Sequence, residues 1–165
     1  TFTSENKTYA PDFGIFEIAR VVEGKKENGE CNERKKLGVV LFSRTKTEKE
    51  LYFKLRDIVM DLASSIKHIP FTFKNTEISH NWQHPKNTAD VLLGGEKIGF
   101  INTLHPAVLA KIDKKAAIVA CEIDMDAFAD MLWTSLNQDN KGSLFVRYID
   151  IATGESETRV VNKNK

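Results

Sequence analysis

The chain has 165 residues, which is enough for one domain with a substantial hydrophobic core. Its 24 basic and 23 acidic side chains give a formal net charge of +1, so charge gives no reason to expect nucleic acid or an anionic membrane as the main partner. No apolar run approaches the roughly 20 residues of a membrane span, and the first residues lack the basic and apolar stretches of a signal peptide. We therefore expect a cytoplasmic protein, and the polar start without methionine suggests a piece of a longer chain.

The first part of the chain predicts two paired strands after a polar lead-in over residues 1–12. Residues 13–22 are rich in β-branched and aromatic side chains, and their alternation is broken, so we expect a strand that is covered on both faces or bulged. A charged loop over residues 23–36 has Asn28-Gly29 at its tip, which is typical of a turn. Residues 37–43 are continuously apolar and predict a returning, central strand.

The clearest helix is predicted over residues 48–67. Thr47 followed by Glu50 fits a capping box, and Thr45 with Glu48 is an alternative register of the same signal. Apolar residues at helical spacing predict one buried stripe: Leu51, Leu55, Ile58, Val59, Leu62 and Ile66.

The next part predicts a short strand over residues 71–73, a loop over residues 74–87, and then a hairpin. Gly94-Gly95 stands between two apolar runs, and glycines supply the positive φ angles that primed hairpin turns require. A strand follows these glycines, whereas a phosphate-binding loop would lead into a helix, so we interpret the pair as a turn. Pro106 then begins a helix, because its missing N–H would have had no partner in the first turn.

The last part predicts a buried strand over residues 116–123 and a helix over residues 125–133 capped by Asp124. Residues 143–150 and 157–161 are expected to form a final hairpin, at the edge of the sheet or apart from it. The order of the elements predicts an α+β fold with a mostly antiparallel sheet and helices on one face.

Few residues suggest a chemical site. His80 and His84 lie four apart, but their surroundings predict a loop and no third ligand is near, so no metal site is predicted. His105 is assigned to the start of a helix, and Cys121 to the core. Trp82 stands in a polar loop as either a lid over the core edge or an interface anchor. We therefore predict no catalytic, cofactor-binding or metal residues, and take Trp82 and His84 as candidate interface residues.

Five short motifs follow one another along the chain: Phe16-Glu17-Ile18-Ala19-Arg20 in a strand, a helix beginning near Lys49, His84-Pro85 followed by Ala89, Lys97-Ile98-Gly99 running into Leu104-His105-Pro106, and Glu122-Ile123-Asp124. In this order and with these gaps, they resemble the catalytic-like core domain of the β subunit of phenylalanyl-tRNA synthetase. The resemblance covers roughly residues 13–133, which leaves a tail over residues 134–165. Where the family usually has Gly-Arg after His-Pro, this chain has Lys86-Asn87.

The resemblance implies a class II synthetase-like antiparallel sheet flanked by helices, in a domain that has lost catalysis. Neither of the arginine motifs with which class II synthetases hold ATP can be placed in this sequence. The family implies that the α subunit carries the active site, so the expected partner is the α subunit, in a heterotetramer that aminoacylates tRNA(Phe) in the cytoplasm. ATP and magnesium are then cofactors of the parent ligase and not of this fragment, tRNA is bound through the whole complex, and no membrane is involved.

Two other functions stay open at this point. One is a free-standing class II-like domain that activates a small carboxylate with ATP, which the missing arginine motifs disfavour. The other is a tRNA-binding module, which the nearly balanced charge disfavours.

Overall fold

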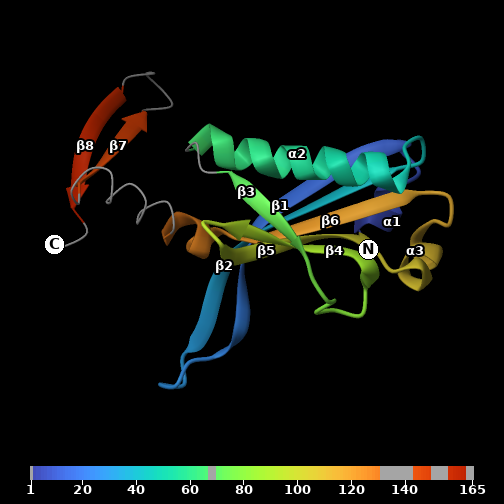
Figure 1. Cartoon of the computed structure of the whole chain (residues 1–165), viewed down its shortest axis with the longest axis horizontal. Coiled ribbons are helices and arrows are strands. Elements are labelled where there is room, and N and C mark those ends of the chain that lie inside the picture. Colours follow the sequence, from blue (N-terminus) through green and yellow to red (C-terminus); the bar gives the residue numbers. More distant parts are fainter. Residues whose placement is uncertain (1, 67–69, 131–142, 150–155, 163–165) are drawn as a thin grey trace. The chain divides into compact units, whose positions relative to one another are not determined.

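The computed structural model describes residues 2–66, 70–130, 143–149 and 156–162. Six strands form one antiparallel sheet in the order β1-β2-β6-β5-β4-β3 (Figure 1). The strands are β1 (Asp12–Lys25), β2 (Cys31–Ser43), β3 (Phe71–Asn75), β4 (Gln83–Leu93), β5 (Glu96–Leu104) and β6 (Ala117–Asp124). The predicted α+β class, the antiparallel pairing and the internal position of β2 are confirmed. A short helix, α1 (Phe2–Asn6), occupies the predicted lead-in.

The chain divides into two compact units, Thr1–Phe128 and Ala129–Lys165. In the second unit, β7 (Ser143–Ile149) pairs antiparallel with β8 (Ser156–Asn162) as a two-stranded sheet of its own. The turn between these strands and the end of the helix predicted over 125–133 lie outside the described residues; within them, residues 125–130 are helical. In the part of the chain that the structure describes, no helix is long and apolar enough to cross a membrane.

The helix α2 (Glu48–Ile66) begins with the predicted capping box. Thr47 N donates a hydrogen bond to Glu50 Oε2 at 2.8 Å, and Glu50 N donates one to Thr47 Oγ1 at 3.3 Å. Each bond satisfies a backbone N–H that has no partner inside the helix. The local signal therefore fixes where α2 starts, and the alternative register at Thr45 is wrong, because the Thr45 hydroxyl donates to Asp12 Oδ2 at 2.5 Å.

One face of the sheet is covered by α2, which packs on β2, β5 and β6 (Figure 1). Three residues of the predicted stripe are buried: Leu51, Leu55 and Val59. The sequence also predicts Ile58 in this stripe, but Ile58 is 43% exposed, because it lies on the flank of α2 beside a groove.

The helix α3 (Pro106–Ile112) packs against the other face of the sheet, so the prediction that helices cover one face only is wrong. Residues opposite each other in paired strands point to the same face, and Phe42 pairs with Ile118. Phe42 and Ile118 belong to a cluster against which three residues of α3 pack: Val108, Leu109 and Ile112. The neighbouring Leu41 points to the opposite face and lines the groove beside α2.

The hairpin of β4 and β5 has the predicted two-residue turn, since Gly94 has φ 60° and Gly95 has φ 90°. However, β4 begins at Gln83, within the segment predicted as a loop. The register of β4 on β5 is irregular between Gln83 and Thr88, around Pro85, which has no N–H to donate to a sheet. Pairing with β5 thus extends a strand through a polar stretch that has little strand character by itself.

Candidate functional site

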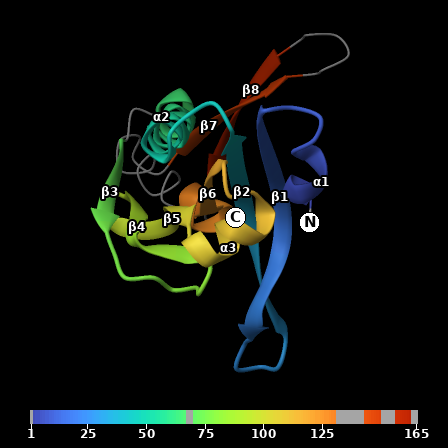
Figure 2. The same cartoon turned by 90° about the vertical axis from the view of Figure 1, so that its right-hand side faces the viewer.

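The largest exposed apolar residues of the sheet lie on β1, which forms one edge, opposite the edge formed by β3 (Figure 2). Phe16 is 73% exposed, Ile18 51% and Val22 60%. The expectation that both faces of this strand are covered is wrong, because Phe16 and Ile18, which share one face of β1, are exposed. The alternative expectation of a bulge within residues 13–22 is also wrong, because the pairing with β2 is regular from Asp12 to Val22 and shifts only between Val22 and Lys25.

An apolar groove of about 550 Å³ lies where β1 and β2 meet the flank of α2. On the sheet side it is lined by Phe16, Ile18 and Val39, and on the helix side by Ile58 and Leu62. Phe16 and Ile18 share this face because side chains two apart in a strand point the same way. We call this set of five residues the β1 surface.

The β1 surface lacks the features that usually keep a sheet edge from pairing with another chain. Long, apolar edge strands offer unpaired backbone groups and invite pairing with another chain, so proteins usually make edges short, charged or covered. Here the edge strand is 14 residues long and presents large apolar side chains. Contiguous exposed apolar area is typical of an interaction site.

Trp82, one of the two candidate interface residues, forms an aromatic group with two neighbours. Its ring stacks on His80 with centroids 5.7 Å apart and planes at 7°, and it lies 5.9 Å from Phe100. Phe100 is buried, so Trp82 and His80 cover it at the start of β4. The interface role stays a prediction.

His84, the other candidate interface residue, is partly exposed. Its Nδ1 accepts a hydrogen bond from Lys86 N at 3.1 Å, which holds the chain around Pro85. Its interface role also stays a prediction.

Two other residues have the structural roles that the sequence predicts. Ala107 N donates to His105 Nδ1 at 3.1 Å, so His105 caps α3. Asp124 Oδ1 accepts from the backbone of Asp126 at 3.0 Å and of Ala127 at 2.9 Å, so Asp124 caps the helical residues 125–130. Both side chains are thus used at helix starts.

Asp124 also belongs to an ion cluster that joins β1, β2 and β6. Lys36 Nζ lies 2.7 Å from Glu23, 3.6 Å from Asp124 and 3.7 Å from Glu122, and Arg34 Nε lies 3.0 Å from Asp124. Burial raises the pKa of Asp124, but the backbone hydrogen bond and the two cations outweigh it and leave the pKa below its ordinary value. Every charge in this cluster has a partner, which indicates a structural role.

Cys121 is a free cysteine that is buried in the core. Burial raises the pKa of the Cys121 thiol to about 12, which keeps it protonated, and its burial confirms the predicted core position. Within residues 2–66, 70–130, 143–149 and 156–162, no three His, Cys, Asp or Glu residues lie close enough to hold a metal ion.

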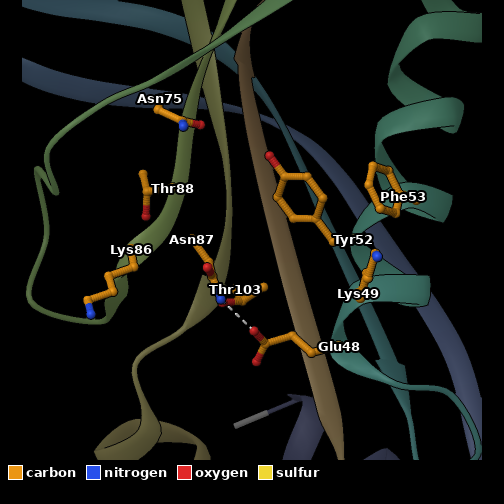
Figure 3. A pocket seen from close by; sticks show the side chains of 9 residues that line it. All are labelled: Glu48, Lys49, Tyr52, Phe53, Asn75, Lys86, Asn87, Thr88 and Thr103. Atoms are coloured by element: carbon orange, nitrogen blue, oxygen red, sulfur yellow. Dashed lines mark hydrogen bonds between the residues drawn. The ribbon is translucent and has the colours of Figure 1, made fainter.

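A second cavity, of about 390 Å³, lies between the start of α2 and the strands β3, β4 and β5 (Figure 3). Tyr52 and Phe53 stand on the helix side, and the Asn87 Nδ2 atom donates a hydrogen bond to Glu48 Oε1 at 2.7 Å. Thr103, from β5, lines the floor of this cavity. Sequence reasoning missed it, because its walls come from four elements and no local motif links them.

These observations define an α+β domain with an antiparallel sheet and an open apolar edge strand. Its relation to known proteins is specific: the sequence profile of the phenylalanyl tRNA synthetase beta chain CLM domain matches residues 3–125. The chain therefore belongs to this family, which confirms the resemblance drawn from its motifs.

Curated relatives agree with this assignment. The chain is 32% identical over 117 residues to the phenylalanine–tRNA ligase beta subunit of Neisseria meningitidis serogroup B, with 68% of this chain and 14% of the relative covered. It is 26% identical over 136 residues to that of Aliivibrio fischeri, with 77% and 17% covered. The chain thus spans about a sixth or less of the length of these relatives.

Proposed function

We propose that the chain is a non-catalytic structural and interaction domain of a phenylalanyl-tRNA synthetase β subunit, with a class II synthetase-like sheet, which supports assembly with the α subunit. In this proposal ATP and magnesium act in the parent ligase, tRNA(Phe) is bound by the whole heterotetramer in the cytoplasm, and this domain contributes indirectly. Membership of the β-chain family supports a subunit role, because a β subunit has a partner subunit by definition.

The single observation that carries the proposal is the β1 surface. Phe16 and Ile18 project from an edge strand, and more than half of each residue's surface is exposed. Burial of apolar area is worth roughly 25 cal/mol per Å², so a partner that covers this surface gains substantially. Aromatic side chains that fill pockets at the centre of an interface carry much of the binding free energy. We therefore assign the β1 surface to the α subunit.

The proposal is tested with a β subunit that contains this chain, co-expressed with its α subunit. The variant Phe16→Ser/Ile18→Ser removes the two exposed apolar side chains of the β1 surface. We expect at least about tenfold weaker association, which corresponds to about 1.4 kcal/mol.

The matched control is Ile78→Ser, because Ile78 is 40% exposed and lies outside the β1 surface. We expect this control to associate as the unchanged protein does. Circular dichroism of each variant checks that the sheet still folds. Equal association of the double variant and the control would show that the α subunit does not dock on the β1 surface, and pyrophosphate exchange with ATP by the chain alone would contradict the non-catalytic role.

A further inference from the structure

The cavity at the start of α2 has the dimensions and lining of a small-molecule site. Its volume of about 390 Å³ falls in the usual range for ligand pockets, roughly 300–1,000 Å³. It lies over β3, β4 and β5, whereas the β1 surface lies over β1 and β2. The two sites share no residue, so an inference about the cavity does not depend on assembly with the α subunit.

A buried hydroxyl without a partner marks the floor of the cavity. Thr103 is 1% exposed, and its Oγ1 has no hydrogen-bond partner among the described residues. Thr103 pairs with Val119, which pairs with Leu41 on the face that α2 covers, so its side chain points toward α2 and the cavity. A buried polar group left without a hydrogen bond costs about 1–3 kcal/mol, so this hydroxyl is suited to a ligand that supplies a polar atom.

A second hydroxyl lies on the helix side. Tyr52 Oη has no hydrogen bond to any described residue, and the ring of Tyr52 stands at 83° to that of Phe53 with centroids 6.0 Å apart (Figure 3). Burial raises the pKa of Tyr52, so its hydroxyl stays protonated and can donate to an anion. The two rings offer apolar surfaces nearly at right angles to each other, which favours an aromatic ligand body.

The charges around the cavity favour a negative ligand. Lys49 and Lys86 line it, and neither has an ion-pair partner among the described residues. The one acid of the lining, Glu48, already accepts the hydrogen bond from Asn87. The charged side chains of the lining are thus two cations and one acid, so their sum favours a ligand carboxylate over a ligand ammonium group.

We propose that this cavity binds a small aromatic carboxylate that lacks an ammonium group. Its ring lies against Tyr52 and Phe53, and its carboxylate accepts hydrogen bonds from the Tyr52 hydroxyl and the Lys49 ammonium group. The Thr103 hydroxyl donates to the same carboxylate.

The test uses the 165-residue chain and two probes that differ in one group, 3-phenylpropionate and L-phenylalanine. Calorimetric titration and two-dimensional amide NMR measure the affinity and the residues affected. We expect saturable binding of 3-phenylpropionate with shifts centred on Lys49, Phe53 and Asn87, and at least about tenfold weaker binding of L-phenylalanine, since one tenfold step corresponds to about 1.4 kcal/mol.

Variants locate the binding. Lys49→Gln and Tyr52→Phe are each expected to weaken 3-phenylpropionate about tenfold, because each removes a charged or hydroxyl donor and keeps the size of the side chain. Lys54→Gln is the matched control, because Lys54 is on the same helix but does not line this cavity. Lack of saturable binding, equal binding by all variants, or equal binding of the two probes would each overturn the proposal. Thermal unfolding of each variant excludes loss of the fold as the cause.

Discussion

Gly99 lies where the backbones of two strands of the sheet approach each other closely. It lies on β5 opposite Ile123 of β6, and its backbone is outside the left-handed region, so its need for glycine is one of space. A Cβ atom at Gly99 would lie 2.1 Å from Glu122 O and 3.0 Å from Ile123 Cα. Ordinary contacts between carbon and oxygen are about 3.3 Å or longer, so Gly99→Ala forces two strands more than about 1 Å apart.

The strand that must move is held on both sides. β6 pairs with β2 on one side and with β5 on the other, so a shift at Glu122 disturbs two sets of hydrogen bonds. Overpacking of a core commonly costs about 1–3 kcal/mol, and a clash with backbone instead of a flexible side chain belongs at the upper end. We expect Gly99→Ala to lower the free energy of unfolding by about 3 kcal/mol, after the small gain from a less flexible unfolded chain.

Gly38→Ala is the matched control, because Gly38 lies on β2 and also pairs with Glu122, but a Cβ atom there meets nothing within 4 Å. It should leave stability unchanged or raise it by about 0.5 kcal/mol. The assay is urea unfolding followed by Trp82 fluorescence in a Trp133→Phe background, so that the signal reports the larger sheet. If the free energy of unfolding of Gly99→Ala lay within about 0.5 kcal/mol of that of Gly38→Ala, the close approach of β5 and β6 would be refuted.

Two further changes test other contacts. Thr103→Val should raise the free energy of unfolding by about 1 kcal/mol in the same assay, because it removes a buried hydroxyl without a partner among the described residues. Thr88→Val should lower the free energy of unfolding by about as much, because the Thr88 hydroxyl donates to His84 O at 2.8 Å. If both variants were destabilised, the Thr103 hydroxyl would have a hydrogen-bond partner in the folded protein. The folded-state pKa of Asp124 lies below its ordinary value of 3.8, so its charge contributes stability that is present above that value and is lost as the pH falls through the folded-state pKa. Asp124→Asn keeps a capping side chain and should flatten this acid-side loss in urea titrations from pH 6 to about pH 2, whereas Glu27→Gln in the exposed hairpin loop should leave it unchanged. An acid-side loss that is equally steep in both variants would exclude Asp124 as its source.

Structural features whose interacting groups lie within a few residues of each other could be predicted from the sequence. The capping box at Thr47 and Glu50, the glycine turn at Gly94-Gly95 and the cap at His105 each satisfy groups next to them in the chain. The groups that bond to each other lie within three residues in the chain, so residue type and spacing are sufficient to predict them.

Features that depend on distant partners could not be predicted in this way. The segment from Gln83 to Thr88 is polar and contains Pro85, which is typical of a loop, yet Gln83 and Thr88 are buried in β4. Gln83 Oε1 accepts hydrogen bonds from Ser79 N at 2.8 Å and His80 N at 3.0 Å, so a local turn satisfies a buried amide oxygen. Polarity alone therefore does not distinguish a loop from a strand that pairs with β5.

The cavity at the start of α2 is a stronger case of the same limit. Thr103 and Asn87 reach it from two strands, and Tyr52 from a helix about 50 residues away along the chain from Thr103. Each of these residues has an ordinary local role in the sequence, such as a polar position in a strand or an aromatic position on a helix. Only the register of β5 on β6 turns the Thr103 hydroxyl toward α2.

The prediction that both faces of β1 are covered was wrong for a different reason. An apolar sequence indicates burial correctly when its strand lies inside a sheet. The order of the strands decides whether a strand is internal or has a neighbouring strand on one side only. β2 pairs with β6 on its far side, which leaves β1 at the edge with Phe16 and Ile18 exposed. The exposure of these two side chains therefore follows from the place of β1 in the strand order, which residue type and spacing along the chain do not give.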